Sequence, residues 1–297
     1  MTQKTTDSFE LLTELTNDIG EGPIWSEADQ SVYWVDAGLK PLSIFRYDTQ
    51  KRLSSEIKLP HRAASLRMNR IDQLLIGYQR GFGLFHLQTQ TLSTLNISGV
   101  NFDDERFNDS GADAKGRLWI GSFDKTLKEK KGQLYKFDGK LDGEIMDSGF
   151  MMSNAIRWSP DNKTMYFCDS RPGVIYAYDY NLDLGTLSNR RVFLDFKNRL
   201  GRPDGAAMDS EGHLWVAEID AGQLLRISPN AIVVQEIKLP VSRPTSLAFG
   251  GKDLKTIYIT SMTYGLKPDE LESQHFAGKL FSMQTNVSGL AENYLCF

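Results

Sequence analysis

Residues 154–180 read NAIRWSPDNKTMYFCDSRPGVIYAYDY and contain three short apolar runs in succession. The first two runs are separated by the polar turn SPDNKT, whose Ser, Pro, Asp and Asn residues favour a tight hairpin. The second run ends in an acidic and a small residue, and a loop containing Gly leads to the third run. Short aromatic and β-branched runs between such turns are typical of antiparallel strands. This stretch therefore predicts a unit of three antiparallel strands.

The same unit recurs along the whole chain at intervals of roughly 40 to 50 residues, a period typical of propeller blades. Its six copies are GPIWSEADQSVYWVD with LSIFRYD, SLRMNRIDQLLIGY with GLFHL, GADAKGRLWIGSF with GQLYKFD, NAIRWSPDNKTMYFCDS with GVIYAYDY, GAAMDSEGHLWVAEI with GQLLRIS, and SLAFGGKDLKTIYITSM with GKLFSM. We therefore predict an all-β fold, a six-bladed β-propeller forming a single domain over residues 1–297. Because an unpaired sheet edge is a liability, the leading segment FELLTELT (residues 9–16) is expected to supply the outer strand of the last blade.

Composition excludes several classes of protein. With 40% hydrophobic and 24% charged residues, the chain resembles an ordinary soluble globular protein. Its net charge of −4 favours neither nucleic acid nor an anionic membrane as a partner. The amino-terminal sequence MTQKTTDSFE lacks the apolar run of a signal peptide, and no stretch reaches the ~18 apolar residues of a membrane span. Two cysteines, Cys168 and Cys296, make no disulfide framework or zinc motif. A cytoplasmic location is expected.

Three motifs place an oxygen ligand just ahead of a predicted innermost strand: GEGPIW around Glu21, MSNAIRW around Asn154 and RPDGAAMD around Asp204. In a propeller these positions line the mouth of the central channel, so the three side chains are expected to converge there. Two carboxylates and an amide form a hard-oxygen site of charge −2, which suits a divalent cation. The alternative is that Asp and Asn are ordinary turn residues. That alternative is weakest for Glu21, which stands between two glycines.

The segment DDERFNDSGAD (residues 103–113) is the richest in polar groups. Arg106 and Asn108 precede the predicted inner strand of the third blade and should also face the channel mouth. A guanidinium there can hold hydroxyl or carbonyl oxygens of a ligand, and an amide can donate and accept at once. Asp109 is expected to cap the local turn or to orient Arg106. The alternative is a surface turn with a salt bridge between Arg106 and its acidic neighbours.

The motifs GEGPIW, RFNDSG, SNAIRWSPDNKTMYFCDS, GRPDGAAMDSEGHLWVA and SRPTSLAFGGKDLKTIYIT together resemble the senescence-marker-protein/gluconolactonase family, which includes regucalcin. The chain looks most similar to the bacterial sugar-lactonase branch. The resemblance implies a six-bladed propeller with one divalent cation, bound by Glu21, Asn154 and Asp204. It further implies that Arg106 and Asn108 bind substrate and that Asp204 is the general base.

One loop departs from the family pattern. Some relatives carry an acidic residue that touches substrate where this chain reads FDKTLKEKKG, and in the lysine-rich loop 124–131 only Glu129 could replace it. Lysines beside the site could favour a lactone with an additional anionic group, whereas the simpler interpretation is a solvated charged loop.

The predicted function is therefore metal-dependent hydrolysis of a sugar lactone to the aldonic acid, by a monomer or weak dimer. Candidate substrates are aldono-1,4- or 1,5-lactones such as glucono-, xylono- or arabinonolactone. The cation is Ca, Mg, Mn, Zn or Fe, and the oxygen ligands do not choose between them. Alternatives are a non-enzymatic calcium-binding propeller like regucalcin, and a promiscuous esterase or organophosphate hydrolase. Arg106 and Asn108 favour the lactonase, because a simple ion site needs no arginine.

Overall fold

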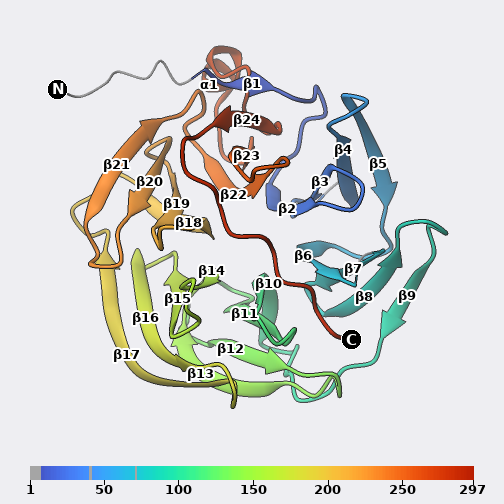
Figure 1. Cartoon of the computed structure of the whole chain (residues 1–297), viewed down its shortest axis with the longest axis vertical. Helices are drawn as coiled ribbons and strands as arrows, with labels where there is room; N and C mark the ends of the chain where they lie inside the picture. Colours follow the sequence, from blue (N-terminus) through green and yellow to red (C-terminus); the bar gives the residue numbers. More distant parts are fainter. Residues whose placement is uncertain (1–7, 40–41, 71) are drawn as a thin grey trace.

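The computed structural model describes residues 8–39, 42–70 and 72–297. Six four-stranded antiparallel sheets are arranged around a central axis (Figure 1). The first strand of each sheet packs against the first strands of its two neighbours, so these strands line the channel. The predicted six-bladed β-propeller is confirmed.

In the first five blades the strands follow chain order from the channel outward. In the sixth blade the outermost strand comes from the beginning of the chain. The first three blades contain β2 (Gly20–Ser26), β3 (Ser31–Asp36), β4 (Ser43–Asp48) and β5 (Leu53–Lys58); β6 (Ala63–Asn69), β7 (Gln73–Tyr78), β8 (Gly81–His86) and β9 (Leu92–Leu95); and β10 (Glu105–Ala112), β11 (Leu118–Asp124), β12 (Gly132–Phe137) and β13 (Glu144–Phe150). The next two contain β14 (Ser153–Trp158), β15 (Thr164–Asp169), β16 (Val174–Asn181) and β17 (Thr186–Asp195); and β18 (Arg202–Met208), β19 (Leu214–Ile219), β20 (Gln223–Ile227) and β21 (Val233–Lys238). The sixth contains β22 (Pro244–Gly250), β23 (Thr256–Ser261), β24 (Phe281–Gln284) and β1 (Glu10–Leu11).

Each blade contains a fourth strand in addition to the three strands that the sequence pattern predicts. These outer strands pair along one edge only and are mostly exposed, as in LSSEIK of β5 and VVQEIK of β21. A strand that buries little has no need of a continuous apolar face, so its period-two signal is weak.

The ring closes through the two ends of the chain. β1 pairs with β24, with Glu10 opposite Ser282 and Leu11 opposite Phe281. The Phe9 ring lies edge-on to that of Phe281 at 6.1 Å. The expectation that residues 9–16 supply the outer strand of the last blade is confirmed, and this strand protects the edge of β24.

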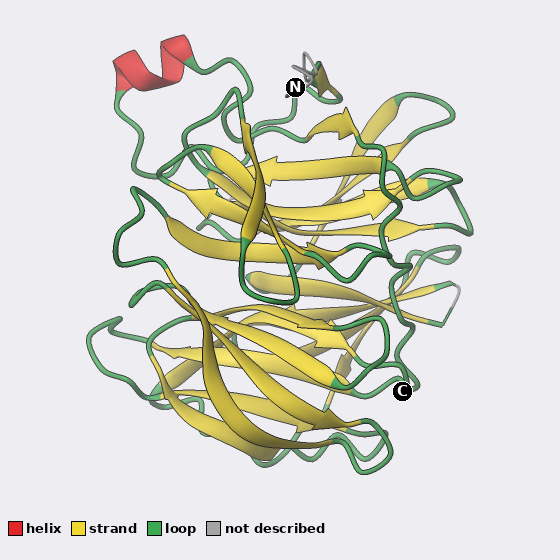
Figure 2. Ribbon diagram, turned by 60° about the vertical axis from the view of Figure 1, so that its left-hand side comes forward, coloured by secondary structure: helices red, strands yellow, loops and turns green. Residues whose placement is uncertain are grey.

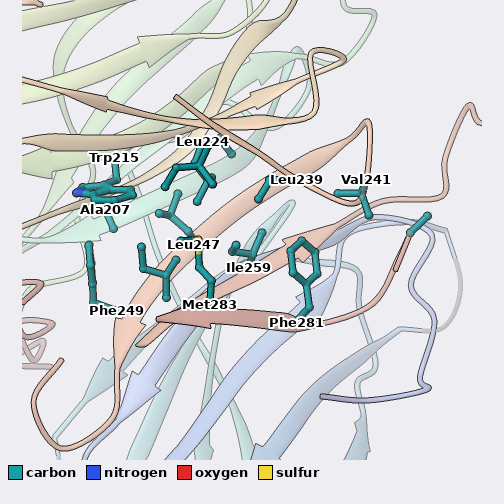
Figure 3. Packing of buried hydrophobic residues seen from close by; sticks show 14 residues of the cluster. Ala207, Trp215, Leu224, Leu239, Val241, Leu247, Phe249, Ile259, Phe281 and Met283 are labelled. Carbon is teal, nitrogen blue, oxygen red and sulfur yellow. The ribbon is translucent and has the colours of Figure 1, made fainter. Parts of the chain in front are cut away.

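Packing between blades forms the core. Figure 3 shows one such contact, in which Trp215 and Leu224 of the fifth blade face Leu247 and Phe249 of the sixth. Close packing of this kind fixes the angle between neighbouring sheets and so the shape of the channel.

Among the described residues there is one short helix, α1 (Pro268–Ser273), which stands away from the sheets on the connection between β23 and β24 (Figure 2). In the described part of the chain no helix has the length and apolar character needed to cross a membrane.

The residues after β24 run across the end of the channel where the inner strands finish (Figure 1). The backbone N–H of Leu290 donates to Met208 O at 3.0 Å, and that of Leu295 donates to Met68 O at 2.8 Å. The N–H of Cys296 donates to Gly116 O at 3.1 Å. This carboxyl-terminal strap, residues 288–297, therefore ties together the fifth, second and third blades at the end opposite the predicted site.

Candidate active site

Every inner strand carries one residue more than its partner strand, and the shift in register falls close to the start of the strand in all six blades. Such β-bulges bend a strand and redirect its side chains. Glu21, Asn154 and Asp204 lie at these bulges, inside β2, β14 and β18. The prediction that they stand ahead of the strands was wrong by a few residues, because turn-like motifs at this point are bulges within the sheet.

The three predicted ligands do not hold strictly equivalent positions. Glu21 and Asn154 are the last paired residues before the shift, opposite Val35 and Cys168. Asp204 comes one residue later in its blade, after Pro203, and lies within the bulge. The residue following each of the first two is left-handed: φ is 54° at Gly22 and 51° at Ala155. Glu21 and Asn154 therefore reach the channel mouth from the last paired position, whereas Asp204 reaches it from within the bulge.

Hydrogen bonds join three of the predicted residues across three blades. Asn154 Nδ2 donates to Asp204 Oδ1 at 2.6 Å. Asn108 Nδ2 donates to Asn154 Oδ1 at 3.0 Å and to Ser153 O at 2.9 Å. Asn154 Nδ2 also donates to Ser170 Oγ at 2.8 Å, a contact that no sequence pattern indicated. Asn108, Asn154 and Asp204 therefore form one connected group.

Glu21 belongs to the same group through its charge. Desolvation raises the pKa of Glu21 well above its usual range, and the negative charges of Asp204 and Asp109 raise it further. Desolvation, followed by the charge of Asp109, raises the pKa of Asp204 to about 8, while Arg202 opposes this shift. The carboxylates repel one another at the channel mouth, and a bound cation would relieve that repulsion.

Asp109 fulfils one of the two roles predicted for it. Its Oδ1 accepts the N–H of Ser110 at 2.7 Å and lies 3.3 Å from Arg67 Nη2. Its Oδ2 accepts the N–H of Ala155 at 2.9 Å. Asp109 thus caps its own bulge, as one interpretation had it, but it orients the bulge of the fourth blade and not Arg106.

Arg106 is not drawn into the connected group. Its Nη1 donates to the backbone carbonyls of Glu105, at 2.6 Å, and Phe102. Among residues 8–39, 42–70 and 72–297, Arg106 forms no ion pair, so the structure gives no support to the salt-bridged surface turn considered as its alternative.

The lysine-rich loop 124–131 connects β11 to β12. Lys131 Nζ lies 3.0 Å from Glu129 Oε2, and Lys125 Nζ donates to the carbonyl of Asp103. Glu129 is exposed and paired within its own loop, so the structure does not place it as a replacement for the missing acidic contact.

Within the described ranges, no three His, Cys, Asp or Glu side chains form a ready metal-binding cluster. The predicted set contains two carboxylates and an amide, and its hard oxygens and unrelieved negative charge fit a divalent cation. Asn154 currently turns its Nδ2 toward Asp204, and rotation of the amide about its last bond would present Oδ1 instead.

Comparison with known proteins places this architecture in context. Residues 19–263 match the family model described as the SMP-30/gluconolactonase/LRE-like region. The chain is 34% identical over 277 residues to a 6-deoxy-6-sulfogluconolactonase of Pseudomonas putida, covering 92% of this chain and 94% of that protein. It is 33% identical over 274 residues to the putative sugar lactone lactonase YvrE of Bacillus subtilis, covering 91% and 92%.

Among solved structures, the calcium-binding protein regucalcin of Agrobacterium tumefaciens superposes with a TM-score of 0.91 at 23% identity, covering 98% of both chains. At that identity the likeness shows the shared fold alone.

Proposed function

The chain belongs to the SMP-30/gluconolactonase/LRE-like family, and from this premise we propose that it is a lactonase that hydrolyses a sugar lactone to the aldonic acid with one divalent cation. Two relatives that match more than nine-tenths of the chain bear lactonase names, which supports the reaction class. The observation that carries the site assignment is the hydrogen-bonded group of Asn108, Asn154 and Asp204 beside the charge of Glu21.

Glu21, Asn154 and Asp204 would hold the cation. When bound, it would supply Lewis-acid polarisation of the ring carbonyl and a lowered pKa for a coordinated water. Asp204 is the group able to take a proton from the attacking water, because its Oδ1 already accepts from Asn154 and its carboxyl is buried among acidic groups.

Asn108 and Arg106 would orient the substrate. Asn108 lies against Asn154 and can exchange its present bonds for bonds to sugar hydroxyls. Arg106 donates to backbone carbonyls near the start of β10. Among the described residues, no carboxylate lies within ion-pair distance of its guanidinium. Fixing the lactone from this side would align its carbonyl with the water, which is a large part of the rate gain in such reactions.

The test is a pH-indicator assay on a panel of five- and six-membered aldonolactones, with chelator and with single cations added back. We expect hydrolysis that is lost on chelation and restored by a cation. The Asp204→Ala variant should lose turnover, and Arg106→Ala should mainly raise KM. Asp183→Ala, on an exposed turn, is the matched control and should behave as wild type.

Two results would contradict the proposal in different ways. Near wild-type turnover by Asp204→Ala with cation bound would remove Asp204 from the mechanism. Cation binding without hydrolysis of any lactone in the panel would favour a binding protein of the regucalcin kind.

A further inference from the structure

Four arginines occupy the same position in four of the six blades. Each immediately precedes the last residue that pairs before the bulge, and the four are Arg62, Arg106, Arg202 and Arg243. The two remaining blades have Gly20 and Ser153 at this position and contribute Glu21 and Asn154. We call these four arginines the arginine collar. It places positive charge at the channel mouth in every blade that does not supply Glu21 or Asn154.

Of the four arginines, Arg202 is closest in sequence to Asp204, the proposed general base. It precedes Asp204 by two residues in β18, and Pro203 between them is the last residue to pair with β19 before the bulge that contains Asp204. Two residues of extended chain span at most about 7 Å between Cα atoms, and Arg202, as the first residue of β18, lies nearer the channel mouth. The charge of Arg202 also acts on Asp204, lowering the pKa of that carboxyl against the effect of burial.

Asp220 joins two members of the collar. Arg202 Nη2 lies 2.9 Å from Asp220 Oδ2, and Arg243 Nε lies 3.0 Å from Asp220 Oδ1. Arg243 Nη1 donates to the carbonyl of Tyr264 at 2.5 Å, which fixes the second guanidinium in place. Two cations therefore share one carboxylate, and the pair keeps a net positive charge.

The pair is held in position but remains open to solvent. The side chains of Arg202 and Arg243 are 37% and 27% exposed. Arg62 and Arg106 donate to backbone carbonyls, Arg62 to Ala37 O at 2.7 Å, and these bonds leave their charge in place. Among the residues that the structure describes, Asp220 is the only carboxylate within ion-pair distance of the collar.

We propose that Arg202 and Arg243, held together by Asp220, form a subsite for an oxyanion group, such as a sulfonate, at the end of the substrate remote from the lactone carbonyl. A guanidinium presents paired N–H donors that match the oxygens of such a group. A neutral sugar lactone would require no net positive charge at this distance from Asp204. The subsite rests on the proposed lactonase function and specifies its substrate class. It assigns anion recognition to the collar and not to the lysine-rich loop.

The experiment compares two lactones that differ in one group: gluconolactone, and the same lactone with a sulfonate in place of the terminal hydroxyl. The readout is the ratio of their kcat/KM values, because loss of fold or of cation would lower both alike. Wild type should favour the sulfonated lactone by about 10-fold or more, and Arg202→Gln or Arg243→Gln should each reduce the ratio about 10-fold. Lys128→Gln removes the same charge from the exposed loop 124–131 and should leave the ratio unchanged.

An unchanged ratio in Arg202→Gln and Arg243→Gln would overturn the subsite, as would an equal loss in Lys128→Gln. Failure of wild type to hydrolyse either lactone would contradict the proposed function instead. Calorimetry would then decide the subsite separately, with the sulfonated aldonate and gluconate as probes. Tighter binding of the sulfonated compound by wild type, lost in Arg202→Gln, would support the subsite, and equal binding would overturn it.

Discussion

Asp109 links three blades through one carboxylate. It accepts N–H groups from Ser110 and Ala155 and lies beside the buried guanidinium of Arg67. Ala155 directly follows Asn154, so Asp109 sets the backbone that carries a proposed ligand. Groups that orient ligands in this way commonly matter to metal affinity nearly as much as the ligands themselves.

We therefore expect Asp109→Ala to reduce divalent-cation affinity by roughly 10- to 100-fold, because two backbone donors lose their acceptor and the fourth-blade bulge is no longer held. Asp109→Asn keeps one acceptor oxygen and should show an intermediate loss. Isothermal calorimetry of the folded variants measures both. Wild-type affinity in Asp109→Ala would show that the bulge is fixed by other contacts.

At the scale of the strand, the left-handed residues of the bulges have an energetic consequence. Gly22 has φ of 54°, and a Cβ added there would meet nothing closer than Ser65 Cα at 3.7 Å. The cost of Gly22→Ala is therefore conformational, and we expect the free energy of unfolding to fall by about 1 to 2 kcal/mol. Urea denaturation measures this change.

Gly139→Ala is the control for that variant. Gly139 lies on an exposed turn without a left-handed φ, and an added Cβ would meet only Cys296 O, at 3.7 Å. Its stability should stay within about 0.5 kcal/mol of wild type. Equal stability of the two variants would mean that the bulge in β2 relaxes without cost.

The bulges also mark the boundary of what sequence patterns could predict. The apolar repeats located the inner, second and third strands, because those strands are buried and alternate. The repeats could not locate the extra residue in each inner strand, since a bulge and a turn use similar residues. Only the pairing shows that Asp204 and Asn108 hold equivalent positions, each directly after the last paired residue before its bulge.

The collar was missed for the same reason. The four arginines of the collar stand in the sequences HRAAS, ERFND, GRPDG and SRPTS. Only the register of the strand pairs shows that the four arginines occupy one position. The contacts of Ser170 and Arg67 had no sequence signal, because each is a single polar residue brought to the site by packing.

For the whole molecule, the acidic mouth couples stability to pH. The pKa of Asp204 is about 8 in the folded chain, against an ordinary value near 4, so between these values the folded state binds more protons than the unfolded state. The free energy of unfolding of cation-free protein should therefore fall as pH rises through this window. A divalent cation binds the deprotonated group, so its stabilising effect should grow with pH over the same range.

Thermal unfolding at pH 5, 6.5 and 8, with chelator and with cation, measures both effects. The gap in Tm between the two conditions should widen toward pH 8, and Asp204→Asn should flatten the chelated series. A gap of equal size at pH 5 and pH 8 would show that Asp204 does not govern cation binding.

The strap of residues 288–297 affects how molecules can pass through the central channel. It lies across the far end of the channel, bonded to Met208 and Met68 near the ends of their strands. We therefore expect the strap to obstruct passage at this end of the channel. Substrate and product would then enter and leave by the opposite end, and an anionic product would pass the arginine collar as it leaves.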